Sequence, residues 1–413
     1  MKAEIISIGD ELLIGQVVNT NASWMAEQLN MAGIKVNCIL AISDQKEQIL
    51  ETLRMASKRS DVLLLTGGLG PTKDDITKKT VCEFYGSKLV FDEDVFKDVK
   101  SIFGKRGFVV SEVNRMQAEV PDNCTPIHNK NGTAPGLWFE KDNTILVSMP
   151  GVPFEMKAMM EGFIIPELSE RFELPSLLNK TVLTHGVGES SLAAIIEDWE
   201  NGLPGNIKLA YLPQPGIVRL RLSGTGKDKA DLQSQIDKEV SKLHGLIPDL
   251  IFGYDRDTME EVIGGLLGAR KATLGTAESC TGGYIAHLIT SVAGSSGYFE
   301  GSVVSYSNSV KEKTLEVSSK TLEEFGAVSE QVVLEMARGA KKRLNVDYAI
   351  AVSGIAGPSG GTDEKPVGTT WIAIATPEKT FAKRFRFGEH RGRNIRRAAL
   401  AALNMLRLEL TSF

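Results

Sequence analysis

Small residues and hydroxyl residues gather in one stretch of the chain, TAESCTGG at residues 276–283. Similar turns follow at AGSS (293–296), SYSN (305–308) and SGIAGP (353–358), and Lys311 comes shortly after SYSN. Glycine lets a backbone approach a ligand closely. Serine becomes a nucleophile when a neighbouring base removes its hydroxyl proton. These residue types therefore indicate an active site in this part of the chain.

Lysine is the better candidate for the base of such a serine. The only histidines of this region are His287 and His390, and no G-x-S-x-G turn frames a serine. Lysine can serve as a base when burial keeps it neutral. Lys311 is the candidate because it follows a strand-like run that ends near Tyr306. On residue types alone, Ser279 in TAESCTGG is the first choice of nucleophile.

A second glycine-rich turn, TGGLGPTKDDIT at residues 66–77, follows the apolar run Val62–Leu65. Backbone amides in such a turn can bind a phosphate. Acidic residues lie near the ends of the neighbouring strand-like runs: Asp10, Asp44, Asp74 and Asp75. Because carboxylate oxygens are the ligands that Mg²⁺ prefers, the pattern predicts a phosphate site with a divalent metal.

Alternating strand and helix patterns are expected to position these turns. Strand-like runs at Ile5–Ile8, Val36–Ala41 and Val62–Leu65 alternate with helical spacing at 20–31 and 45–57. This order predicts a doubly wound α/β sheet, which binds ligands at the carboxyl ends of its strands.

The rest of the chain divides into two further parts. Residues 172–250 read as a small α+β connector, with a helix near 190–199, a strand near 218–222 and a second helix near 229–243. Alternation of strands and helices then resumes to the end of the chain. We expect two α/β domains joined by the connector, with the boundaries 1–171, 172–250 and 251–413.

Composition narrows the class of protein. The chain has 413 residues, 42% of them hydrophobic and 24% charged, which is typical of a globular protein. Its net charge of -5 argues against general nucleic-acid binding. Four scattered cysteines without a CxxC pair argue against a disulfide framework or a zinc site. With no signal-like start and no membrane-length apolar stretch, we expect a cytoplasmic protein without a membrane partner.

The order and spacing of five segments resemble the carboxyl-terminal domain of the CinA family. They are TAESCTGG, AGSSGYFEGSVVSYSN with Lys311, GAVSE (326–330), SGIAGPSGGTDEKPVGT (353–369) and GEHR (388–391). The resemblance implies a nicotinamide-nucleotide amidase. Such an enzyme hydrolyses the carboxamide of nicotinamide mononucleotide to nicotinate mononucleotide and ammonia, and it needs no metal or other cofactor.

The resemblance also implies roles for single residues. The nucleophile falls on Ser296, with Ser295 as a competitor, and the general base falls on Lys311. Substrate-contacting positions fall on Tyr306, Ser353 and Arg391, of which Arg391 suits a phosphate. The other positions of the substrate pocket are Ser279, Thr281 and Gly282.

The amino-terminal part resembles the molybdopterin-binding fold of the MoaB and MogA proteins. GGLGPTKDDIT, GTAPG (132–136) and MPGVPFEM (149–156) are similar to the CinA amino-terminal domain in particular. This implies a metal-dependent ADP-ribose pyrophosphatase, which releases AMP and ribose 5-phosphate, with Mg²⁺ or a similar ion as cofactor. Asp75 and Asp44 are the expected metal ligands. The expected substrate-binding residues are Gly67, Gly68, Gly70, Thr72 and Gly151.

The expected partners are small nucleotides, namely nicotinamide mononucleotide and ADP-ribose, together with a second copy of the chain in a homodimer. Two alternatives stay open. One is a protein that binds or adenylylates molybdopterin. The other is a competence-associated interaction protein without catalytic activity.

Overall fold

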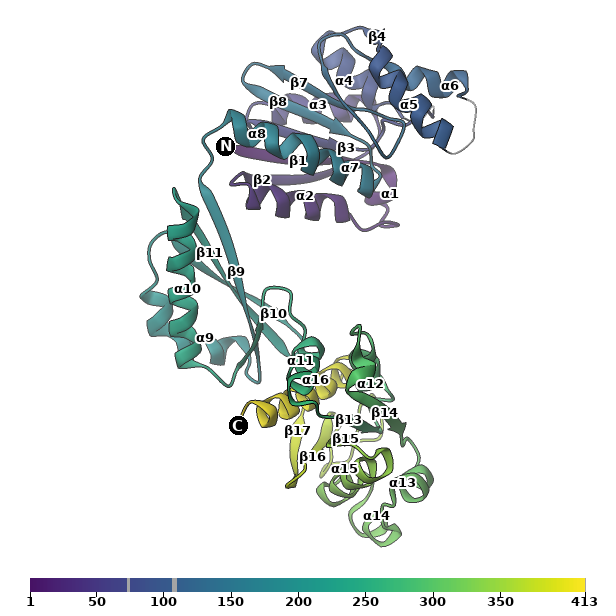
Figure 1. Cartoon of the computed structure of the whole chain (residues 1–413), viewed down its shortest axis with the longest axis vertical. Coiled ribbons are helices and arrows are strands. Elements are labelled where there is room, and N and C mark those ends of the chain that lie inside the picture. Colours follow the sequence, from purple (N-terminus) through teal and green to yellow (C-terminus); the bar gives the residue numbers. More distant parts are fainter. Residues whose placement is uncertain (73–74, 106–109, 413) are drawn as a thin grey trace. The chain divides into compact units, whose positions relative to one another are not determined.

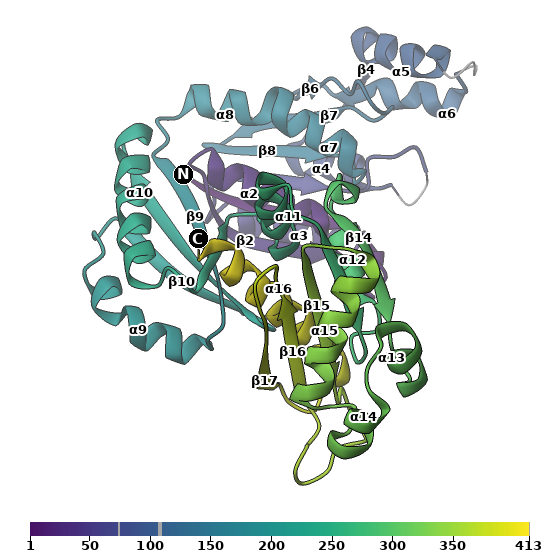
Figure 2. The same ribbon diagram turned by 60° about the horizontal axis from the view of Figure 1, so that its bottom comes forward.

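The structure, a computed structural model, describes residues 1–72, 75–105 and 110–412. The chain forms two compact units: Met1–Leu178 with Thr225–Leu232, and the remainder of the described chain from Asn179. Figures 1 and 2 show the ribbon from two directions, coloured along the sequence. None of the helices among the described residues is long and apolar enough to span a bilayer.

A mixed sheet forms the centre of the first unit, with strand order β2-β1-β3-β8-β7-β6. The first four strands of this order are parallel, and the last two are antiparallel. Their bounds are β1 Lys2–Ile8, β2 Lys35–Ile42, β3 Val62–Thr66, β6 Thr125–Ile127, β7 Gly136–Lys141 and β8 Thr144–Met149. A separate antiparallel pair consists of β4 Leu89–Phe91 and β5 Glu119–Pro121.

Helices cover both faces of this sheet. On β3, Leu64 belongs to the core that contains Met25 and Met156, whereas Leu63 and Leu65 belong to the core that contains Leu53. Successive side chains of a strand point to opposite faces, so a strand buried on both faces has to be apolar throughout. The helices of this unit are α1 Asp10–Leu13, α2 Thr20–Met31, α3 Lys46–Ala56, α4 Thr77–Tyr85, α5 Glu93–Lys105, α6 Glu112–Arg115, η1 Met116–Ala118, α7 Pro153–Met159, η2 Met160–Ile164 and α8 Ile165–Arg171.

The connector is a four-stranded antiparallel sheet with two helices in the order β-α-β-β-α-β. Its strand order is β10-β11-β9-β12. The bounds are β9 Ser176–His185, α9 Glu189–Asn201, β10 Ile207–Gln214, β11 Ile217–Gly226, α10 Lys229–Leu246 and β12 Ile251–Tyr254. Leu183 and Phe252 of this sheet pack into the same core as Leu400, so the connector shares its core with the domain that follows.

The last domain has a five-stranded sheet in the order β14-β13-β15-β16-β17. The first three strands are parallel, and β16 and β17 are antiparallel. Ile350 and Val352 of β15 pack into the core with α11 and α16, whereas Ala349 and Ala351 pack into the core with α15. Figure 2 shows α15 lying along the sheet. The strands are β13 Leu274–Glu278, β14 Phe299–Val304, β15 Tyr348–Gly354, β16 Thr369–Ala375 and β17 Thr380–Arg386. The helices are α11 Met259–Arg270, α12 Tyr284–Thr290, η3 Ser295–Gly297, α13 Asn308–Leu315, α14 Ser319–Phe325, α15 Glu330–Leu344 and α16 Arg391–Thr411.

The prediction of two α/β domains joined by an α+β connector is confirmed.

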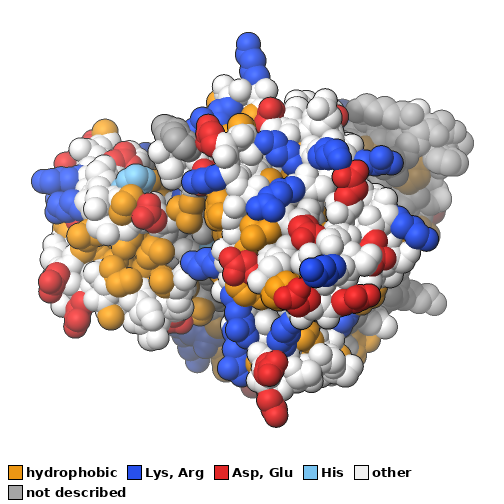
Figure 3. Space-filling model, turned by 90° about the horizontal axis from the view of Figure 1, so that it is seen from below, with side chains coloured by type: hydrophobic (Ala, Val, Ile, Leu, Met, Phe, Trp, Pro, Cys, Tyr) orange, Lys and Arg blue, Asp and Glu red, His pale blue; other side chains and the backbone are white. Residues whose placement is uncertain are grey.

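The distribution of charged side chains on the surface is also informative. On the face shown in Figure 3, Lys and Arg side chains are interspersed with Asp and Glu side chains. This face therefore presents no continuous surface of one sign.

Candidate active sites

Three neighbouring parallel strands of the last domain bring the serine-rich turns together. Ser279 follows β13, Ser305 and Tyr306 follow β14, and Ser353 lies near the end of β15. These strands are adjacent in the sheet, so their carboxyl ends meet at one edge. The backbone confirms the adjacency, because Ser279 N–H donates to Val352 O at 2.9 Å and Ser305 N–H donates to Glu278 O at 2.8 Å.

Lys311 reaches this edge from α13 and contacts Ser279. Its Nζ lies 3.3 Å from Ser279 Oγ and donates to Ser305 O at 2.7 Å. The side chain is 1% exposed, and no carboxylate among the described residues forms an ion pair with it. Burial lowers the pKa of Lys311 below its usual 10.5, because a charge is poorly solvated there. A buried lysine with a lowered pKa, next to a serine hydroxyl, can act as a general base.

The structure does not place Ser296 next to Lys311, the pairing that the resemblance implied. Ser296 is exposed and lies in η3, before β14 begins. The register pairs Leu274 with Phe299, so η3 lies at the amino end of these parallel strands. A strand of six residues spans roughly 20 Å at about 3.3 Å per residue. Ser296 therefore lies at the amino ends of these strands, whereas Lys311 lies at their carboxyl ends. The alternative nucleophile Ser295 lies in the same turn.

Glu278 fixes the turn that carries Ser279. Its side chain is fully buried, and its carboxylate accepts hydrogen bonds from the backbone N–H groups of Gly283, Ile285 and Ala286 at 2.8–3.0 Å. Gly282, which lies between Ser279 and Gly283, has a φ of 61° and donates its N–H to Ser279 O at 3.1 Å. A left-handed conformation of this kind favours glycine. Hydrogen bonds therefore fix the turn after Ser279 at its start and at its end.

The other expected substrate contacts surround the same edge. Arg391, the first residue of α16, donates to Gly357 O at 2.9 Å and to the Tyr306 hydroxyl at 3.4 Å. Tyr306 is 63% exposed, so its ring is open to a ligand. Ser353 is buried and donates its hydroxyl to Ala327 O at 2.6 Å, which leaves it able only to accept from a ligand.

Two buried hydroxyls beside Ser279 have no hydrogen-bond partner among the described residues, Thr281 Oγ1 and Ser305 Oγ. Thr281 was expected in the substrate pocket, whereas Ser305 was not singled out. An unpaired buried hydroxyl is costly, by about 1–3 kcal/mol, and a bound ligand or water would satisfy it. Ser305 could have been found from its position directly after a strand, β14.

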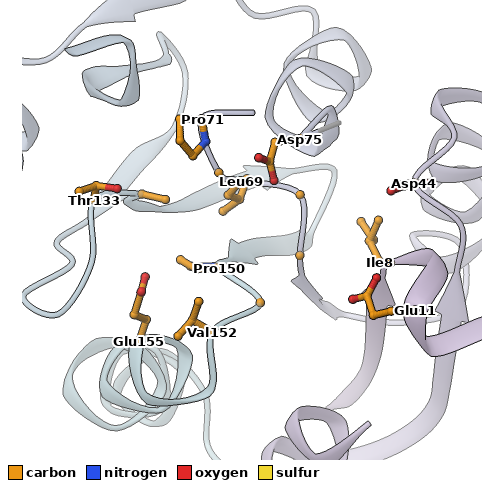
Figure 4. A pocket seen from close by; sticks show the side chains of 16 residues that line it. Ile8, Glu11, Asp44, Leu69, Pro71, Asp75, Thr133, Pro150, Val152 and Glu155 are labelled. Carbon is orange, nitrogen blue, oxygen red and sulfur yellow. The ribbon is translucent and has the colours of Figure 1, made fainter. Parts of the chain in front are cut away.

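In the first unit, a cavity of about 440 Å³ opens at the carboxyl ends of the parallel strands. Figure 4 shows carboxylates reaching it from several elements, among them those of Glu11 and Glu155. Six of the expected residues line the cavity: Gly67, Gly68, Gly70, Gly151, Asp44 and Asp75. Gly67 is required by close packing, because a Cβ at this position would lie 2.2 Å from Ile8 O. The structure therefore brings most of the predicted residues into one site.

Thr72 contacts Asp75 and does not line the cavity. Its N–H donates to Asp75 Oδ2 at 2.9 Å, and its hydroxyl donates to the same oxygen. Asp10 begins α1 and is exposed, and it does not line the cavity. Asp74 lies outside the described residues.

Glu11 and Glu155 also line the cavity, and neither was assigned a site role from the sequence. Glu155 is 9% exposed and accepts a hydrogen bond from Asn129 Nδ2 at 2.7 Å. Its position in MPGVPFEM, four residues after the cavity residue Gly151, was the available signal. Among the described residues, no three His, Cys, Asp or Glu side chains lie close enough together to hold a metal ion by themselves.

Three protein-family models match the chain. The model described as "Probable molybdopterin binding domain" matches residues 4–170. The "Damage-inducible protein CinA KH domain" matches residues 179–253, and the "CinA C-terminal domain" matches residues 256–410. The second match falls on the connector, for which sequence reasoning had given no family of its own.

Curated relatives match over nearly the whole length. The "CinA-like protein" of Flavobacterium psychrophilum is 48% identical over 414 residues, which cover 99% of both chains. The "CinA-like protein" of Cytophaga hutchinsonii is 45% identical over 408 residues, which cover 99% of this chain and 98% of the relative. A solved CinA-superfamily protein from Klebsiella pneumoniae is 34% identical, with a TM-score of 0.37, and the match covers 38% of this chain and 100% of that one.

Proposed function

This chain belongs to the CinA family, and on that premise we propose that its last domain hydrolyses the carboxamide of nicotinamide mononucleotide. The products are nicotinate mononucleotide and ammonia. The observation that carries the proposal is the 3.3 Å contact between Ser279 Oγ and the buried Nζ of Lys311. In the proposal Ser279 replaces Ser296 as the nucleophile, because Ser279 is the serine that lies beside the base.

The reaction proceeds by acyl transfer. Neutral Lys311 removes the hydroxyl proton as Ser279 Oγ attacks the carboxamide carbon. The resulting ammonium of Lys311 returns that proton to the leaving nitrogen, and ammonia departs. A water molecule then attacks the ester carbonyl and gives one proton to Lys311, which passes it to Ser279 Oγ as the acid is released. Burial supports this role, since it favours the uncharged amine that must accept the proton.

The other residues at the carboxyl ends of these strands bind the substrate in this proposal. The Arg391 guanidinium suits the phosphate of the mononucleotide, because its planar donors match phosphate oxygens. The exposed ring of Tyr306 suits stacking on the pyridine. The unpaired hydroxyls of Thr281 and Ser305 are buried beside Ser279.

The test is ammonia release from nicotinamide mononucleotide by the purified protein in the presence of EDTA. Ser279→Ala should lower kcat by about a thousandfold or more, because the nucleophile is lost. Ser296→Ala is the matched control and should keep near-normal turnover. The reverse result, with Ser296→Ala inactive and Ser279→Ala active, would exclude this site. A folded wild-type protein that released no ammonia would exclude the amidase.

A second activity is proposed for the first unit, the hydrolysis of ADP-ribose to AMP and ribose 5-phosphate. The supporting observation is the glycine-lined cavity with Asp44 and Asp75 in its wall. Backbone amides of the turn from Gly67 to Gly70 suit the diphosphate. Because the domain is similar to a molybdopterin-binding domain, binding of molybdopterin without turnover of ADP-ribose is the competing result.

The cavity residues fit a divalent metal that shares its coordination with the substrate. Mg²⁺ is usually held by one or two carboxylates and by substrate phosphates rather than by a complete protein cage. Asp75 and Asp44 would hold it, with Thr72 orienting the Asp75 carboxylate. When bound, the ion would polarise the diphosphate and neutralise its charge.

We would measure AMP formation from ADP-ribose as a function of Mg²⁺ concentration. Asp75→Asn should raise the Mg²⁺ concentration needed for half-maximal rate and lower kcat, by about tenfold or more. Asp10→Asn, outside the cavity, is the control and should leave both unchanged. An Asp75→Asn protein with the wild-type metal dependence would remove Asp75 from the proposed ligand set.

A further inference from the structure

A second cavity, of about 490 Å³, lies within the second unit between the connector and the last domain, and neither proposed activity uses it. The turn before α9 and the β10–β11 hairpin form one side. Phe385, Arg386 and Phe387 at the end of β17, together with Arg397 of α16, form the other. The shared core of Leu183, Phe252 and Leu400 holds these elements together.

The two arginines make this cavity cationic. Among the described residues, neither Arg386 nor Arg397 forms an ion pair. Arg397 Nη1 donates to Phe387 O at 3.0 Å, which positions the guanidinium and leaves its other donors free. Guanidinium groups without carboxylate partners in a concave site are suited to a phosphate.

The first turn of α9 adds further donors. The helix has 13 residues, and its N-cap, Gly188, offers no side chain to cap it. The first amide groups of a helix have no partner within the helix, and they carry its positive dipole end. Gly188 and Glu189 both line the cavity, so these amides border it.

His185 is a lining residue with an unpaired buried polar atom. It lines the cavity, is 8% exposed, and its Nδ1 has no hydrogen-bond partner among the described residues. Burial, with a smaller contribution from Arg407, lowers the pKa of His185 to about 4, so the ring is neutral at pH 7. A neutral imidazole offers one donor and one acceptor.

Aromatic rings and one carboxylate complete the lining. The rings of Phe385 and Phe387 are stacked, with centroids 5.5 Å apart and planes 9° apart, and both are partly exposed. Such a pair offers a flat surface to a planar base. Glu189 is the acidic residue of the wall. A carboxylate would repel a bare anion but accepts hydrogen bonds from ribose hydroxyls.

We propose that this cavity is a separate nucleotide site that binds a nucleoside monophosphate. The phosphate lies between Arg386, Arg397 and the first turn of α9. The base lies against Phe385 and Phe387. The site is independent of both proposed reactions.

The test follows hydrogen–deuterium exchange of the full chain with and without AMP. This readout locates binding, so AMP held elsewhere in the molecule does not interfere. AMP should slow exchange of the amides at residues 188–191. The double variant Arg386→Ala/Arg397→Ala should weaken that protection at least tenfold in AMP concentration and leave ammonia release unchanged. Arg343→Ala, an exposed arginine of α15 outside this cavity, is the matched control and should behave as wild type.

Two results would overturn the proposal. One is the absence of protection at residues 188–191 at millimolar AMP. The other is equal protection by inorganic phosphate and AMP, which would mean that the rings contribute nothing and that no nucleotide is recognised. Should loss of Arg397 disturb β17, Arg386→Ala alone decides the matter, since no hydrogen bond in the described structure depends on that guanidinium.

Discussion

Lys311 affects the stability of the folded protein as well as the proposed catalysis. Its pKa is lowered in the folded protein and ordinary, near 10.5, in the unfolded chain. Between these two values the unfolded chain binds more protons, so the free energy of unfolding rises with pH across that window. Below the folded pKa the protein must bury a charged amine, which is unfavourable.

Lys311→Met should therefore make the protein more stable and inactive. We expect its free energy of unfolding at pH 7 to exceed that of the wild type by about 1 kcal/mol, as is common when a strained active-site residue is replaced. The difference should shrink as pH approaches 10.5. Urea unfolding at several pH values measures this. A variant less stable than the wild type at pH 7 would contradict the unfavourable burial of the amine.

Glu278 is a positioning residue for Ser279, and its effect should appear in kcat. Glu278→Gln replaces one accepting oxygen with an NH₂ group, which cannot accept from the N–H groups now bound. We expect kcat for ammonia release to fall by about 10–100-fold with KM nearly unchanged, because the nucleophile shifts while the substrate contacts remain. Glu300→Gln on β14 is the control, as this glutamate is exposed. An equal fall in that control would assign the effect to charge alone.

Residue types pointed to Ser279 as the nucleophile, whereas the family resemblance pointed to Ser296. The structure places Ser279 beside Lys311. Ser279 stood out because it lies in the segment richest in small residues and hydroxyls. Ser296 came from the resemblance, and nothing in a local sequence shows at which edge of a sheet a turn lies. That information lies in the parallel register of β13 and β14, a contact between distant parts of the chain.

At the scale of elements, α13 carries Lys311 and is held against α15 by a close contact. A Cβ on Gly339 would lie 1.9 Å from Leu315 O. Gly339→Ala must therefore push α13 away from α15, and we expect a loss of about 1–3 kcal/mol in stability together with reduced kcat. Gly265→Ala in α11 is the matched control, because no atom lies within 4 Å of its Cβ position. That change should be neutral or slightly stabilising. Thermal unfolding and ammonia release measure both.

Elements with strong periodicity could be predicted, and those without it could not. The helix expected at 20–31 is α2, because Met25 and Leu29 recur at helical spacing and Asn19 accepts from Ala22 N–H as its cap. The bounds of β13, Leu274–Glu278, could not be predicted from the local sequence, since its end is set by pairing with β14 and β15. Helix α15 was missed, although Val332, Met336 and Ala340 line one face of it.

At the scale of the whole molecule, the candidate amidase site draws on residues of the last domain alone. The contacts of Ser279, Lys311 and Arg391 all fall between residues 278 and 391. A chain of residues 175–413, which keeps the connector and its shared core, should release ammonia with a kcat within about twofold of the full-length protein. It should also lose all ADP-ribose turnover. A folded but inactive fragment would show that the first unit contributes to the amidase.

The edge strand β17 has a consequence for how the protein behaves at high concentration. It pairs with β16 alone, so its outer backbone groups are open to another strand. Lys383, Arg384 and Arg386 follow one another closely along it and are all exposed. Cations on an open edge repel a second edge and oppose aggregation into extended sheets. The charges of this strand therefore help to keep the protein dispersed at high concentration.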